Sequence, residues 1–84
     1  MWKLEKSHKG RSLVFALSGR LEQAQLPELQ RILAVQSEKQ NVVLDLKELK
    51  LVDQAVVSFL ADCESSGIHL ENCPAYIREW IRRQ

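Results

Sequence analysis

Two thiols and two imidazoles have the chemistry for metal binding or nucleophilic catalysis: those of Cys63, Cys73, His8 and His69. A zinc site needs such ligands at short spacings such as C-x-x-C or H-x-x-x-H, and neither spacing occurs here. Cys63 also falls on a helical apolar stripe, which favours a buried, inert thiol. We therefore expect no metal and no cofactor. A small enzyme using Cys73 and His69 is an alternative hypothesis.

Two carboxylates, Glu22 and Asp53, follow predicted strands and could approach each other. General acid–base catalysis needs such a pair in a concave pocket that shifts the pKa values, and a small domain offers little pocket. Solvated charge in a loop is the expected role of Glu22, and a helix N-cap is the expected role of Asp53. A carboxylate-dependent enzyme is the second form of the enzyme alternative, and our main expectation is that the protein is not an enzyme.

Length, charge and hydrophobicity limit the classes of protein that fit. The 84 residues are 45% hydrophobic, which suits one domain spanning residues 1–84 with a single core. Twelve basic residues against 11 acidic ones give a net charge of +1, which argues against a nucleic-acid partner. No apolar run approaches the ~18 residues of a membrane span, so we expect no membrane insertion. Without an export signal or a cysteine framework, the expected location is cytoplasmic.

Alternating apolar residues predict four strands, over residues 2–6, 13–19, 42–46 and 68–70. The first two form a hairpin whose turn spans residues 8–11 around Gly10. The alternation also divides the sheet into two faces. One face is apolar, and the other is mixed and at least partly open, with Val14, Ala16 and Val43 on it. Self-association through this mixed face, as a homodimer, is an alternative hypothesis.

Apolar residues spaced by three and four predict three helices, with stripes at Leu26, Leu29, Ile32 and Leu33, at Val56, Phe59, Leu60 and Cys63, and at Ile77, Trp80 and Ile81. Asp53 and Gly67 fit the two ends of the middle helix, and Pro27 and Pro74 fit helix starts. Asn41 is expected to supply a left-handed cap after the first helix. The order is β-β-α-β-α-β-α. Right-handed crossovers then predict an α/β fold with a small four-stranded mixed sheet and helices mainly on one face.

Three stretches in this order resemble the STAS domain, the fold of bacterial anti-sigma-factor antagonists. They are GRLE at 19–22 followed by LPEL at 26–29, NVVLDL at 41–46, and LVD at 51–53. The resemblance spans nearly the whole chain. It implies a protein–protein interaction module in signal transduction and transcription regulation, whose partner is an anti-sigma kinase. STAS proteins also resemble small cytoplasmic subunits of lipid-transporting ABC complexes, which would make the partner a transporter ATPase.

One departure from the STAS pattern concerns the regulatory site. The family's phosphorylated Ser or Thr lies two residues after the Asp that matches Asp53, and Ala55 occupies that position. Alanine has no hydroxyl to phosphorylate, so the resemblance implies constitutive rather than phosphorylation-gated binding. Ser58, one helical turn on, is the candidate substitute. The implied docking surface comprises Arg20, Glu22, Asp53, Gln54, Ala55 and Ser58.

Overall fold

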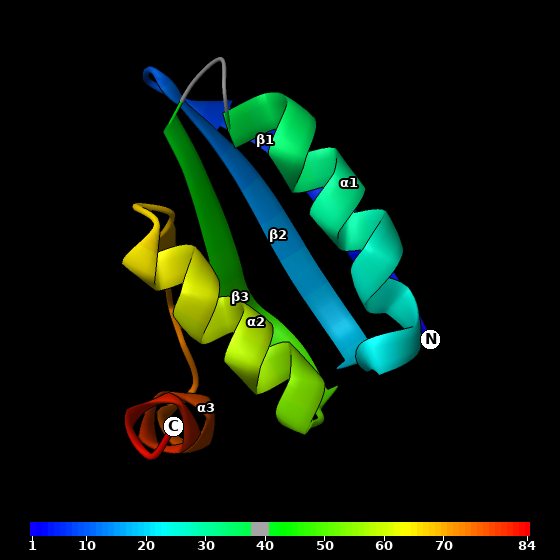
Figure 1. The fold of residues 1–84 in the computed structure, drawn as a ribbon. Helices are drawn as coiled ribbons and strands as arrows, with labels where there is room; N and C mark the ends of the chain where they lie inside the picture. Colours follow the sequence, from blue (N-terminus) through cyan, green and yellow to red (C-terminus); the bar gives the residue numbers. More distant parts are fainter. Residues whose placement is uncertain (38–40) are drawn as a thin grey trace.

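The computed structural model of the protein describes residues 1–37 and 41–84, whose elements follow the predicted order (Figure 1). The elements are β1 (Trp2–Lys9), β2 (Ser12–Leu21), the short 3₁₀ turn η1 (Gln23–Gln25), α1 (Leu26–Ser37), β3 (Asn41–Val52), α2 (Gln54–Ser65), β4 (His69–Glu71) and α3 (Ala75–Arg82). The four strands form one sheet in the order β1-β2-β3-β4, with β1 antiparallel to β2 and the other pairs parallel. The predicted α/β fold class is therefore confirmed.

Helices α1 and α2 are the crossover connections between parallel strands, and both lie in front of the sheet in Figure 1. Their apolar stripes and the inward residues of the strands form one core, because each element can bury its apolar face only against the other layer. Phe15, Leu44 and Leu60 are fully buried in this core. Further members include Leu13, Leu17, Leu21, Leu29, Leu46, Val56, Val57 and Ile77.

Strand β3 has 12 residues, more than twice the length of the stretch 42–46 that the alternation predicted. Its pairing with β2 shifts register between Ala16 and Ser18 and again between Gly19 and Arg20. A bulge of this kind inserts an extra residue and breaks the two-residue period, so the alternation stops while the strand continues. Residues Leu51 and Val52, expected in a loop, therefore lie in β3 and extend the sheet up to Asp53.

Two predictions about the ends of elements are wrong. His8 lies in β1 opposite Leu13, so the turn is confined to Gly10 and Arg11. Asn41 begins β3 and supplies no left-handed cap. Among the described residues, the non-glycine residue with positive φ is Asn72 (φ 54°), between β4 and α3. Asparagine tolerates this conformation better than most residues, so Asn72 can end the strand sharply before α3.

The mixed face of the sheet exposes less apolar surface than its sequence suggested. Val14 and Val43 lie opposite each other in the centre of the sheet and are only 9% and 8% exposed. In the sheet, Val14 lies beside Ser7 on β1, and Val43 lies beside His69 on β4. These two valines therefore expose little apolar surface, and self-association through the mixed face stays a prediction.

Helix α3 packs on α2 beside the sheet (Figure 1). The anchor is Ile77, which is fully buried, and an ion pair joins Arg78 Nη1 to Glu64 Oε1 at 2.8 Å. Hydrogen bonding to this guanidinium lowers the pKa of the Glu64 carboxyl. None of the helices in the described residues is long and apolar enough to span a bilayer.

Candidate functional site

Asp53 joins two segments that are distant in the sequence. Its Oδ1 accepts a hydrogen bond from Val56 N (3.1 Å), which caps the start of α2 as predicted. Its Oδ2 accepts a second hydrogen bond, from Gln23 N (2.9 Å), in the turn that follows β2. A cap of this kind contributes about 1 kcal/mol, and the second bond adds a similar amount. Asp53 therefore fixes the end of β2 against the beginning of α2.

This junction brings together the six residues implied by the STAS resemblance. Arg20 lies opposite Leu51 in the sheet, and Glu22 directly precedes η1. The side chains of Arg20, Glu22 and Gln54 are exposed. Those of Asp53, Ala55 and Ser58 are half-buried. We call this set the α2-start surface: Arg20, Glu22, Asp53, Gln54, Ala55 and Ser58.

The chain after α3 covers part of the α2-start surface. Ser58 Oγ donates a hydrogen bond to Gln84 Oε1 (2.7 Å), and Gln54 Nε2 donates to the same oxygen (3.2 Å). Because the Ser58 hydroxyl is bonded, a kinase would first have to break its hydrogen bond to the exposed Gln84 side chain. The structure thus gives a physical reason why Ser58 is a poor replacement for a hydroxyl at position 55.

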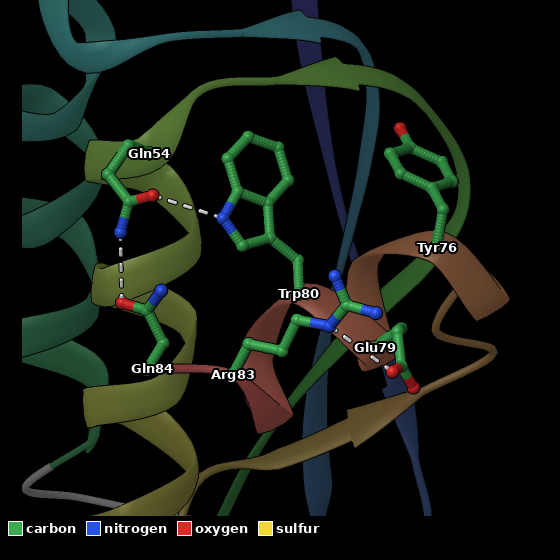
Figure 2. Close-up of a pocket in the computed structure, with 6 residues that line it drawn as sticks. All are labelled: Gln54, Tyr76, Glu79, Trp80, Arg83 and Gln84. Carbon is green, nitrogen blue, oxygen red and sulfur yellow. Dashed lines mark hydrogen bonds and ion pairs between the residues drawn. The ribbon is translucent and has the colours of Figure 1, made fainter.

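A groove of about 740 Å³ lies between the start of α2 and α3 (Figure 2). It shares Gln54 with the α2-start surface, and Gln54 Oε1 accepts a hydrogen bond from Trp80 Nε1 (3.0 Å). On the other side, Tyr76 Oη donates to Lys50 O on β3 (2.9 Å). The remaining lining residues are Glu79, Arg83 and Gln84. Sequence analysis missed this groove. It placed Trp80 on the apolar stripe of the last helix, and Trp80 does pack against the core, where it is half-buried.

The spacing of residues in α3 contains the signal that could have revealed the groove. Ile77 and Ile81 form one pair four residues apart, and Tyr76 and Trp80 form a second, neighbouring pair. Residues so spaced share a helix face, and a short helix buries one such face well. The isoleucine pair packs on the core, with Ile77 fully buried. The aromatic pair lies at the border of the core, where the Tyr76 side chain is 48% exposed.

Neither carboxylate of the enzyme alternative has the environment of a catalytic base. Both oxygens of Asp53 already accept backbone hydrogen bonds, and Glu22 is exposed. Across residues 1–37 and 41–84, no group of three or more His, Cys, Asp or Glu side chains is placed to hold a metal ion. Asp53 therefore has the environment of a helix cap, and Glu22 that of a solvated carboxylate.

The two thiols are also poorly suited to nucleophilic chemistry. Burial raises the pKa of Cys63 to about 12. Burial also raises the pKa of Cys73, although the nearby Arg78 guanidinium opposes the rise. The Cys73 Sγ contacts Pro74 O at 3.7 Å, and the imidazole of His69 lies 3.9 Å from Glu71 instead. A raised pKa leaves less thiolate at neutral pH, and the thiolate is the reactive form.

We expect both cysteines to react more slowly than free cysteine with a thiol reagent at pH 7, and Cys63 to react more slowly than Cys73. Peptide mass spectrometry after timed alkylation separates the two rates. The same assay in denaturant is the control, because unfolding should equalise the two rates. A native Cys73 that reacts faster than free cysteine would contradict this expectation and favour the thiol-enzyme alternative.

In comparisons with known proteins, no protein-family model matches the chain, and no curated protein matches it.

Proposed function

We propose that the protein is a non-enzymatic interaction module of the STAS type, which binds a protein partner through the α2-start surface. The partner is an anti-sigma kinase, and the setting is signal transduction and transcription regulation in the cytoplasm. Binding is constitutive with respect to position 55, because Ala55 carries no phosphorylatable hydroxyl.

The observation that carries this proposal is the double hydrogen bonding of Asp53. By holding Gln23 N and Val56 N at once, its carboxylate orders a loop and a helix start into one rigid surface. A preorganised surface loses less entropy when a partner binds, which is a general requirement for affinity.

The groove beside this surface supports a protein partner in particular. Aromatic side chains in concave sites are common anchors of protein interfaces. Trp80 and Tyr76 line the groove together with Gln54, which belongs to the α2-start surface. A side chain from the partner can therefore enter the groove while the rest of its interface rests on the start of α2.

The test is affinity purification from the native cell with single substitutions. Gln54→Arg places a bulky charge where the surface meets the groove, and we expect about tenfold lower recovery of the specific partner. Gln30→Arg is the matched control, because Gln30 is an exposed glutamine on α1. Circular dichroism checks that both variants fold. Equal recovery with the two variants would place the interface elsewhere.

The identity of the recovered protein separates the two forms of the proposal. An anti-sigma kinase supports the leading form. The ATPase of a lipid-transporting ABC complex supports the alternative, in which the protein is a small subunit of a transporter. A partner that is recovered equally with Gln54→Arg is bound by another surface and supports neither.

A further inference from the structure

Within residues 1–37 and 41–84, β1 is an edge strand of the sheet, and its outer side carries a row of backbone hydrogen-bonding groups that no other described strand pairs with. Met1 O accepts a hydrogen bond from Arg20 N (3.1 Å), and the pairing of β1 with β2 continues without a shift. In an antiparallel ladder, alternate residues direct both backbone groups toward the partner strand. Odd-numbered residues of β1 therefore bond to β2. The residues that direct their N–H and C=O groups away from the sheet are Trp2, Leu4, Lys6 and His8.

This edge is an efficient template for another strand. β1 is eight residues long and contains no proline, whereas the opposite edge strand, β4, has three residues. A long, regular edge with unpaired backbone groups tends to pair with a further strand unless charges restrict the pairing. Lys3, Lys6 and Lys9 provide such charges. They limit which registers are favourable, and so they indicate what can pair with β1.

We propose that the partner is a second copy of the same chain. The two β1 strands pair antiparallel about a two-fold axis that passes beside Leu4 and runs perpendicular to the sheet. Two four-stranded sheets then form one continuous sheet. Because Leu4 is one of the residues with outward backbone groups, the central pair of the new ladder is hydrogen-bonded.

Charge complementarity selects this register. An axis perpendicular to the sheet keeps opposite residues on the same face, so Lys3 meets Glu5 of the second copy, and Glu5 meets Lys3. On the other face, Leu4 meets Leu4, and the Lys6 ammonium meets the Trp2 ring, which attracts cations. Trp2 and Leu4 are half-buried in one copy, so each still has apolar surface for the second copy to cover.

Three neighbouring registers are unfavourable because they oppose like charges. Centring the pair on Lys3, Glu5 or Lys6 places that residue against its own copy, and opposite like charges are destabilising. Centring the pair on Ser7 pairs Glu5 with Lys9, but it leaves Trp2 and Leu4 outside the β1–β1 ladder. Among registers centred on residues 3–7, the one at Leu4 combines pairs of acid with base and a pair of apolar residues.

Charge reversal tests the proposal by sedimentation. Lys3→Glu or Glu5→Lys turns both attractive pairs repulsive, so we expect the dissociation constant to rise about tenfold or more. The double variant Lys3→Glu/Glu5→Lys re-forms both pairs with reversed signs and should restore the dimer. Lys9→Glu is the matched control, because Lys9 is exposed on the same strand outside the paired segment. The four variants change only three positions, all of them exposed, so we expect the fold to be retained.

Hydrogen exchange locates the interface. In the dimer, the Leu4 and Lys6 amides become bonded, so we expect slower exchange in the original sequence than in Glu5→Lys. A chain that sediments as a monomer at millimolar concentration would overturn the proposal. So would a dimer that neither single reversal weakens, because its interface would lie elsewhere.

Discussion

Gly19→Ala is expected to lower the free energy of unfolding by about 3 kcal/mol, from two costs that add. Gly19 has φ +86°, a left-handed conformation that costs an L residue roughly 1–2 kcal/mol. An added Cβ would also overlap the Met1 carbonyl oxygen. To relieve the overlap, the chain must give up the hydrogen bond from Arg20 N to that oxygen, at about 1 kcal/mol.

Gly10→Ala is the matched control for this prediction. Gly10 also has positive φ (+63°), but an added Cβ would have no atom within 4 Å. The expected loss is therefore the conformational cost alone, about 1 kcal/mol. Urea unfolding of both variants gives the two values. Equal losses at Gly10 and Gly19 would show that the close approach of Met1 contributes nothing.

The second large effect concerns binding rather than stability. Ala55→Asp adds a carboxylate in the first turn of α2, where the helix dipole favours negative charge. Ala55 is half-buried against the core, so part of this gain is offset by desolvation, and thermal unfolding checks that the variant folds. The same carboxylate joins Glu22 and Asp53 on the α2-start surface. Desolvating an extra, unpaired charge in an interface is costly, so we expect about 100-fold weaker partner binding. This charge also imitates part of the effect of a phosphate at position 55.

Much of the fold could be predicted because the local patterns agree with the packing. The apolar stripe at Val56, Leu60 and Cys63 is buried, and Asp53 caps the helix that carries it. Gly67, predicted to end this helix, has the left-handed φ (+102°) that such an end requires. In each case a single residue type has a strong local preference, and the tertiary structure satisfies it.

The parts that could not be predicted depend on contacts between distant segments. The two register shifts in β3 arise from its pairing with β2 and interrupt the alternation of apolar and polar residues. The alternation in the sequence of β3 therefore does not indicate where the strand ends. The Asp53 bond to Gln23 spans 30 positions in the chain, and so does the Gln54 bond to Gln84. Periodicity describes one segment at a time, so it identified Asp53 as a cap but missed its second hydrogen bond and the groove at Trp80.

The most direct measurement of the central claim is a calorimetric titration of the purified partner into three forms of the protein. These are the original sequence, Ala55→Asp and Ala55→Ser, with thermal unfolding of each as the check on folding. We expect the original sequence to bind without any phosphorylation, the serine variant to bind within about threefold of it, and the aspartate variant to bind about 100-fold more weakly. A folded Ala55→Asp that binds as tightly as the original sequence would contradict docking at the start of α2.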